Sequence, residues 1–305
     1  MTRQVDRMVL LAASIEQAVA WKGEHRERAR FAAGGTDLLL QTRSGKLKPE
    51  VFIRLPAVSA RVVVDGATLV LPALATLADL AAHPLILKHV PVLAQAMTQI
   101  GSPQIRNVAT LAGNLCNASP AADSAPVLLV YDASVVLTSV SGRRELPLDQ
   151  LFLGPGKTAL AQDELLLEVR IPLPPDGEAA FFRKFGPRGA NVISSASFAA
   201  RVKLSGTVVE RAFLAAGSVG PRPLRLKNTE KSLAGVDVAS LAVRPVSASA
   251  QGEAPGDKTL PDAVLSALGK DISPITDVRG SGWYKGQVIE RCMQWLADRL
   301  GGSEQ

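Results

Sequence analysis

Two segments of the chain gather residue types that can bind a phosphate group or sugar hydroxyls. In the first, Phe31-Ala-Ala-Gly-Gly-Thr-Asp-Leu38, an extended run enters paired glycines and then a short helix capped by Thr36 or Asp37. Glycines let a ligand approach the backbone, and the N–H groups at a helix start favour an anion. A plain tight turn explains this pattern equally well, and the Asp37 carboxylate would repel a phosphate at which it pointed.

The second segment runs from Gly101 to Asp123 and is rich in Gly, Ser, Asn and Pro, with apolar residues spaced through it. A long irregular stretch must satisfy its own backbone polar groups, and such stretches usually have a function. Thr110, Gly113 and Asn114 offer hydrogen-bond donors, and Asp123 offers a carboxylate suited to sugar hydroxyls. We therefore expect this segment to wrap a large polar ligand.

The composition restricts the chemistry that the chain performs alone. Its 305 residues include two cysteines, Cys116 and Cys292, and three histidines. These are too few for a disulfide framework, a four-cysteine zinc site or a four-cysteine iron–sulfur cluster. We expect no metal site in the chain, and we interpret Cys292 as a small buried residue of the core.

The charge and hydropathy patterns exclude two further classes of protein. The 34 Lys and Arg residues exceed the 28 Asp and Glu residues by six, but aromatic residues make up only 4% of the chain. A nucleic-acid surface needs basic residues interleaved with aromatics, so we expect none. No stretch of about 20 apolar residues could span a membrane, and the N-terminus lacks the features of a signal peptide. The chain is therefore expected to be cytoplasmic.

The stretch Gly154-Pro-Gly-Lys-Thr158 looks like part of a nucleotide-binding P-loop. Leu151 stands where a P-loop needs its first glycine, so we interpret this stretch as a structural turn.

The apolar periodicity and the turn residues predict an α+β protein. The first 57 residues read as a compact β-α-β-α-β unit, and the prolines at 172–175 mark a domain boundary. A turn is expected between His83 and His89, and residues 236–261 read as a loose connection. Strands are expected at 9–12, 30–33, 51–54, 62–64, 68–71, 134–138, 143–146, 165–171, 179–185, 193–204 and 208–215. Helices are expected at 14–21, 36–40, 76–82, 91–100, 123–131, 229–233, 260–268 and 283–300.

In the two segments described first, the chain resembles a known family, the FAD-binding (medium) subunits of molybdenum hydroxylases of the xanthine dehydrogenase and carbon monoxide dehydrogenase type. The motifs that carry the resemblance are Ala33-Gly-Gly-Thr-Asp37, Ile100-Gly-Ser-Pro-Gln-Ile-Arg-Asn107, Thr110-Leu-Ala-Gly-Asn114 and Ala118-Ser-Pro-Ala-Ala-Asp123. Further along, Leu153-Gly-Pro-Gly-Lys-Thr158 and Asp277-Val-Arg-Gly-Ser-Gly-Trp-Tyr-Lys285 are similar to the family's sequences. The resemblance covers nearly the whole chain.

The resemblance implies a PCMH-type (vanillyl-alcohol-oxidase-like) FAD-binding domain of two subdomains, followed by a smaller α+β C-terminal domain of the CO dehydrogenase flavoprotein type. The subdomains would be residues 1–57 and 58–175, and the C-terminal domain would be residues 176–305.

The resemblance also implies which residues bind the cofactor. The turn at 31–38 would hold the FAD diphosphate through N–H groups, 110–114 would form a second cradle, Asp123 would bind sugar hydroxyls, and Ile100 would line the flavin pocket. The full set is Phe31, Ala32, Ala33, Gly34, Gly35, Thr36, Asp37, Leu38, Ile100, Thr110, Leu111, Ala112, Gly113, Asn114, Asp123, Leu166 and Lys184.

Three positions depart from the family pattern. Ala112 replaces a glycine of the second cradle, and Lys285 replaces an arginine. Asn191 stands where an acidic residue is common near the flavin ring. We expect Ala112 to tighten the approach to phosphate and Asn191 to alter the flavin potential.

The implied function is electron transfer by an oxidoreductase subunit. Electrons would come from [2Fe–2S] clusters of a small subunit, with molybdopterin in a large subunit, and would leave from FAD to NAD+ or another acceptor. No side chain of this chain would be catalytic, and the complex would be a dimer of heterotrimers. One alternative is a stand-alone FAD-dependent oxidoreductase of the same fold. A second is an assembly protein that has lost the flavin, against which the intact cradle motifs argue.

Overall fold

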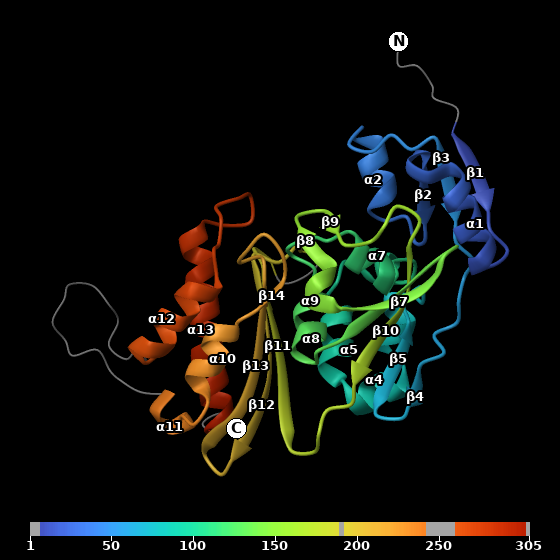
Figure 1. The fold of residues 1–305 in the computed structure, drawn as a ribbon. Helices are drawn as coiled ribbons and strands as arrows, with labels where there is room; N and C mark the ends of the chain where they lie inside the picture. The colour runs from blue at the N-terminus through green and yellow to red at the C-terminus, as the bar shows by residue number, and fades with distance from the viewer. Residues whose placement is uncertain (1–6, 189–191, 242–259, 303–305) are drawn as a thin grey trace. The chain divides into compact units, whose positions relative to one another are not determined.

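The computed structural model describes residues 7–188, 192–241 and 260–302, so Asn191 and most of the expected connection at 236–261 lie outside the described residues. The chain is α+β, and its fold is traced in Figure 1. It divides into two compact units. The first unit combines residues 1–119 with residues 132–173, and the second combines residues 120–131 with residues 174–305.

The first unit begins with a three-stranded parallel sheet in the order β1-β3-β2. Its elements are β1 (Met8–Leu11), α1 (Ile15–His25), η1 (Arg26–Arg28), β2 (Ala29–Ala32), α2 (Leu38–Arg43) and β3 (Val51–Arg54). Helix α1 starts after Ser14, whose hydroxyl accepts a hydrogen bond from the Gln17 N–H, as an N-cap residue should. This arrangement confirms the expected β-α-β-α-β order.

A five-stranded antiparallel sheet, in the order β4-β5-β10-β6-β7, forms the rest of the first unit's framework. Its strands are β4 (Val63–Asp65), β5 (Thr68–Pro72), β6 (Ser134–Ser139), β7 (Gly142–Pro147) and β10 (Leu165–Pro172). The accompanying helices are α3 (Leu77–Ala81), α4 (Pro84–His89), α5 (Pro91–Thr98), α6 (Pro103–Arg106), α7 (Leu111–Cys116) and α9 (Leu148–Leu151). Helix α3 starts as expected at Thr76, whose hydroxyl accepts the Asp79 N–H.

Two sequence expectations for this unit were wrong. The stretch between His83 and His89 is not a turn but helix α4, which His83 caps by accepting the Leu85 N–H at Nδ1. The stretch from Gly101 to Ala121 is not irregular throughout, because it contains α6 and α7. The false P-loop is a structural turn, as expected, and joins β8 (Phe152–Gly154) to β9 (Lys157–Thr158).

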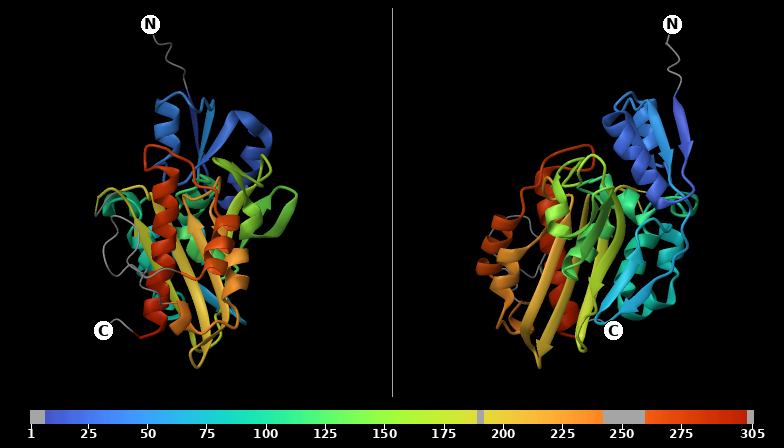
Figure 2. Two further views of the ribbon diagram at one scale, coloured as in Figure 1. Left: turned by 90° about the vertical axis from the view of Figure 1, so that its left-hand side faces the viewer. Right: turned by 45° about the vertical axis from the view of Figure 1, so that its right-hand side comes forward.

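The second unit is built on an antiparallel sheet in the order β11-β12-β13-β14. Its strands are β11 (Glu178–Phe185), β12 (Ala196–Ser205), β13 (Val208–Gly217) and β14 (Leu224–Arg225). Its helices are α8 (Ser124–Val130), α10 (Lys227–Leu233), α11 (Val238–Leu241), α12 (Asp262–Asp271) and α13 (Gly282–Leu300). Figure 1 shows α10, α12 and α13 on one face of this sheet and α8 on the other, and Figure 2 shows α13 along the sheet. Cys292 belongs to α13 and is fully buried in the core of this unit, as expected.

Two arginines anchor the C-terminal end of α8 within the second unit. Arg201 Nε donates to the carbonyl oxygen of Val130 at 2.8 Å, and Arg225 Nη1 donates to that of Leu129 at 3.1 Å. Both guanidinium groups also lie over the ring of Phe213, at 4.1 and 4.9 Å from its centroid. Cations at the end of a helix are favoured by its dipole, so these contacts hold α8 on the sheet.

Candidate cofactor site

In the first unit, the glycine turn lies at the carboxyl edge of the parallel sheet. Strand β2 ends at Ala32 and β3 ends at Arg54, and these two residues are partners in the parallel register. Ligands of open parallel sheets bind outside this edge. The segment at 31–38 therefore stands where the backbone topology favours a ligand.

The turn presents a run of N–H groups that the protein leaves without acceptors. Within the described residues, the N–H groups of Gly34, Gly35, Thr36, Asp37 and Leu38 donate no hydrogen bond. Gly35 has φ +73°, a left-handed conformation that a glycine adopts without strain. A succession of such N–H groups forms a concave site for an anion. These residues therefore fit the diphosphate of a dinucleotide cofactor.

Asp37 precedes α2 but does not cap it with its side chain, which corrects part of the sequence expectation. Its backbone carbonyl accepts the Gln41 N–H instead. Burial raises the pKa of the Asp37 carboxyl above its ordinary value.

Gly34 brings the two predicted segments together. A Cβ atom on Gly34 would lie 1.9 Å from the carbonyl oxygen of Val108 and 2.9 Å from the Cα of Ala109. No side chain fits there, because both obstacles are backbone atoms. The first glycine turn and residues 108–109 of the second segment therefore touch through their main chains.

Three N–H groups of residues 110–114 are already used inside the protein. The hydroxyl of Thr110 accepts the Gly113 N–H at 3.0 Å, and its carbonyl accepts the Asn114 N–H. The Ala112 N–H donates to the carbonyl of Ala73 at 2.7 Å. Residues 110–114 thus form the start of α7, and Thr110 lines the site, while the run of five free N–H groups belongs to the first segment.

A pocket of about 230 Å³ lies beside the glycine turn within the first unit. Arg54 and Asn107, which line it, are not among the predicted site residues. The signal that could have found Arg54 is its place at the end of a strand in a parallel sheet. The remaining lining residues are Ala33, Gly34, Leu55, Pro56, Ala57, Val58, Leu74, Thr76, Val108 and Thr110.

Two further predicted residues, Ile100 and Leu166, also lie in the first unit. Ile100 lies in a turn whose carbonyl oxygen accepts a hydrogen bond from Arg106 Nη1 at 3.2 Å. Leu166 is fully buried in β10, beside an irregularity in the strand register. The carbonyl of the next residue, Leu167, accepts the N–H of Ala73, the residue that also binds the start of α7.

In the second unit, Asp123 and Lys184 form a buried ion pair. Their Oδ2 and Nζ atoms are 2.7 Å apart, and their side chains are 5% and 7% exposed. The hydroxyl of Ser194 also donates to Asp123. Asp123 is the residue before α8, at the start of the helix expected at 123–131; an aspartate at this position is expected to cap the helix, but its side chain makes no capping bond.

Burial is the largest influence on this carboxylate. It raises the pKa of Asp123, against the charge of Lys184 and the hydrogen bonds from Lys184 and Ser194. Ser197 pairs with Lys184 across the sheet, and its hydroxyl is buried without a hydrogen-bond partner among the described residues. An unsatisfied buried hydroxyl is costly, so this polar cluster fits a ligand that carries hydroxyl groups.

The motif from Asp277 to Lys285 forms a second cluster of charges in the second unit. Lys285, which is 1% exposed, donates to Asp277 Oδ2 and to the carbonyl of Ile275, both at 2.9 Å. Arg279 also pairs with Asp277 at 2.9 Å. Burial by itself would raise the pKa of Asp277, but hydrogen bonds from Lys285 and Arg279 outweigh it and lower this pKa to about 2. The motif thus fixes the loop that leads into α13.

Neither cysteine is suited to thiolate chemistry. Burial raises the pKa of Cys116 and of Cys292 to about 12, so both thiols are protonated at neutral pH. Within the described residues, no group of three or more His, Cys, Asp and Glu side chains could hold a metal ion. In the same part of the chain, no helix is long and apolar enough to cross a membrane.

Two family models match the chain. One, the FAD binding domain in molybdopterin dehydrogenase, matches residues 3–174, and the other, the CO dehydrogenase flavoprotein C-terminal domain, matches residues 180–255. The chain therefore belongs to the family of flavoprotein subunits that these two models describe. It is therefore an FAD-containing oxidoreductase subunit of the molybdenum hydroxylase family.

Individual relatives agree with the family assignment. The xanthine dehydrogenase FAD-binding subunit of Escherichia coli O157:H7 is 32% identical over 92% of this chain and 90% of its own length. The carbon monoxide dehydrogenase medium chain of Hydrogenophaga pseudoflava is 28% identical over 92% of this chain and 93% of its own. A solved structure of carbon monoxide dehydrogenase from that organism matches with a TM-score of 0.82 and 26% identity, covering 95% of this chain and 98% of that one.

Proposed function

We propose that this flavoprotein chain is the electron-transfer subunit of a molybdopterin-containing hydroxylase or dehydrogenase. When bound, FAD supplies the redox chemistry by which electrons from [2Fe–2S] clusters of a partner subunit reach NAD+ or another acceptor. The observation that carries the proposal is the run of five N–H groups, from Gly34 to Leu38, without acceptors in the described structure.

The residues of the chain bind and orient the cofactor. The backbone of 31–38 holds the diphosphate, and Gly34 packs against the backbone of Val108 and Ala109, just before the predicted second cradle at 110–114. Asp123 accepts hydrogen bonds from sugar hydroxyls, with Lys184 keeping its carboxylate charged and in place. Ile100 and Leu166 contribute apolar surface to the flavin pocket.

No side chain of this chain is proposed to act as an acid, base or nucleophile. The thiols are protonated, and Asp123 is committed to Lys184 and Ser194. The chain's contribution is positioning and electrostatics, which is what a protein commonly supplies to a cofactor.

The proposed assembly is a dimer of heterotrimers. Each heterotrimer would hold this chain, a large molybdopterin-binding subunit and a small subunit with [2Fe–2S] clusters. We also propose that the sequence domains are residues 1–57, 58–175 and 176–305.

The cofactor is tested on the full chain expressed alone. Acid extraction followed by chromatography should release FAD, either as purified or after reconstitution. Absence of FAD in both preparations would overturn the proposal. Asp123→Ala should weaken FAD retention, whereas Asp65→Ala, at the exposed end of β4, should leave it unchanged.

The partners are tested by affinity purification from the native host. We expect a molybdopterin subunit and an iron–sulfur subunit to accompany the chain. Purification of a flavoprotein without either subunit would instead support a stand-alone FAD-dependent oxidoreductase.

A further inference from the structure

Arg54 is the last residue of β3 and lies beside the glycine turn. Its Nη1 donates to the carbonyl oxygen of Ala33 at 2.9 Å, one residue before the run of free N–H groups starts. This bond fixes the guanidinium group at the carboxyl edge of the parallel sheet. The arginine also lines the pocket of about 230 Å³ together with Gly34 and Thr110.

The surroundings of the pocket are poor in positive charge. Among the described residues that line it, Arg54 alone is charged. The segment at 31–38 contains no Lys or Arg, and the second segment contains Arg106. Arg106 is directed to the carbonyl oxygens of Ile100 and Gly101, at 3.2 and 3.0 Å.

A diphosphate needs more than neutral donors. The free N–H groups from Gly34 to Leu38 supply hydrogen bonds but no net charge. A guanidinium group has five N–H donors in a planar fork that matches phosphate oxygens, and one of these donors is used at Ala33. The remaining donors of Arg54 are available beside the turn.

We propose that Arg54 binds the diphosphate of the cofactor and supplies the positive charge that the backbone turn lacks. The inference rests on the proposed binding of FAD to the same turn. Arg54 then determines how tightly ligands with an adenosine diphosphate group are held, and it makes their affinity dependent on salt.

The test measures binding rather than turnover. The full chain, freed of flavin, is titrated with FAD and separately with ADP in a calorimeter, in about 0.05 M and about 0.5 M salt. Loss of one charge-assisted hydrogen-bonded group in Arg54→Met should raise the Kd of both ligands about 10- to 100-fold at low salt. The difference from the unmodified chain should shrink at high salt, because salt screens the charge.

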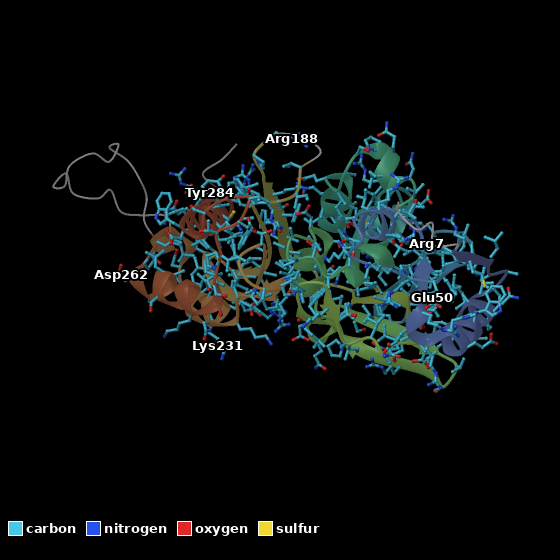
Figure 3. All side chains as sticks on the ribbon, turned by 90° about the horizontal axis from the view of Figure 1, so that it is seen from above. Arg7, Glu50, Arg188, Lys231, Asp262 and Tyr284 are labelled. Carbon is cyan, nitrogen blue, oxygen red and sulfur yellow. The ribbon has the colours of Figure 1, made fainter. Side chains whose placement is uncertain are left out.

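Arg28→Met is the matched control. Arg28 lies at the opposite edge of the same sheet and pairs with Glu50 across 3.8 Å, with both side chains about 60% exposed. Glu50, which directly precedes β3, is labelled in Figure 3. This variant makes the same change in net charge but should leave both Kd values unchanged.

Arg54→Lys tests the charge separately from the fork. It should lose part of the affinity and keep the salt dependence, and it serves as the test if thermal unfolding shows that Arg54→Met is not folded. An Arg54→Met chain that is folded and binds FAD and ADP as tightly as the unmodified chain would overturn the inference alone. An unmodified chain that binds no FAD would overturn the proposed function as well.

Discussion

The two units present opposite kinds of binding chemistry. In the first unit, the glycine turn offers neutral backbone N–H groups, and a side chain is excluded at Gly34. In the second unit, Asp123 and Lys184 offer full charges that are almost entirely buried. The backbone site depends on the path of the chain, whereas the ion pair depends on two side chains that are 61 residues apart in sequence. The first should therefore fail through steric change and the second through loss of a partner.

The largest expected effect comes from breaking the ion pair. Lys184→Met leaves the Asp123 carboxylate buried with only part of its hydrogen bonding. The free energy of unfolding should fall by about 3–5 kcal/mol, as measured by urea denaturation. Lys203→Met on β12, which breaks an exposed pair with Glu210, should cost at most about 1 kcal/mol.

Two results bear on this prediction. Combining Asp123→Asn with Lys184→Met should restore much of the loss, because no unpaired charge is then buried. Equal costs for Lys184→Met and Lys203→Met would show that burial does not separate the two pairs.

The next effect in size concerns the glycine turn. Gly34→Ala puts a Cβ atom against the backbone of Val108, so the two segments must move apart. We expect a loss of about 1–3 kcal/mol in unfolding free energy and a parallel loss of FAD retention. Gly23→Ala, in the last turn of α1, is the control: the added Cβ atom would lie 3.6 Å from Val140, and the change should stabilise the chain by roughly 0.4–1 kcal/mol. Normal FAD retention by Gly34→Ala would contradict the role of close backbone approach.

A smaller effect is expected from the wall of the site. Thr110→Ala removes the hydroxyl that accepts the Gly113 N–H at the start of α7. The cost should be about 1 kcal/mol in thermal or urea unfolding, and Thr110→Ser should recover most of it. If Thr110→Ser were as unstable as Thr110→Ala, the hydroxyl would not be the stabilising group.

The smallest effect concerns two carboxyl groups of the second unit whose pKa values move in opposite directions. The pKa of Asp277 is lowered from 3.8 to about 2, so its contribution to stability is present above pH 3.8 and is lost as the pH falls toward 2. The pKa of Asp123 is raised, so its contribution is present below pH 3.8 and is lost as the pH rises.

Denaturation curves between pH 5 and about 2 separate these contributions. Asp277→Asn should lose less stability on acidification than the unmodified chain, and Asp123→Asn should lose more. Identical pH profiles for the three proteins would show that neither carboxyl is coupled to folding.

Much of the framework could be predicted because its signals are local. Strand β3 was predicted at the residues it occupies, and Ser14 and Thr76 start helices where their hydroxyls indicated. Helix α7 was missed because Gly and Asn are poor helix formers, and its start is stabilised by a bond to Ala73 far away in sequence.

The candidate site was likewise only partly predictable from the sequence. The glycine turn was visible as paired glycines, but its open N–H groups were not, since hydrogen-bond partners are a property of the fold. The partners of Asp123 lie on elements remote in sequence, and Arg54 belongs to no motif. Such contacts depend on tertiary structure, and residue types and spacing do not reveal them.

Helix α8 has a consequence for how the gene can be divided. It lies inside the range of the FAD-binding family model, yet all seven of its residues are buried and it packs on strands β12, β13 and β14. Cutting the chain after residue 175 would therefore separate an apolar helix from its sheet. The two halves recognised by family models are not interchangeable modules, and a chimaera that joins them from different relatives must match α8 to the sheet it covers.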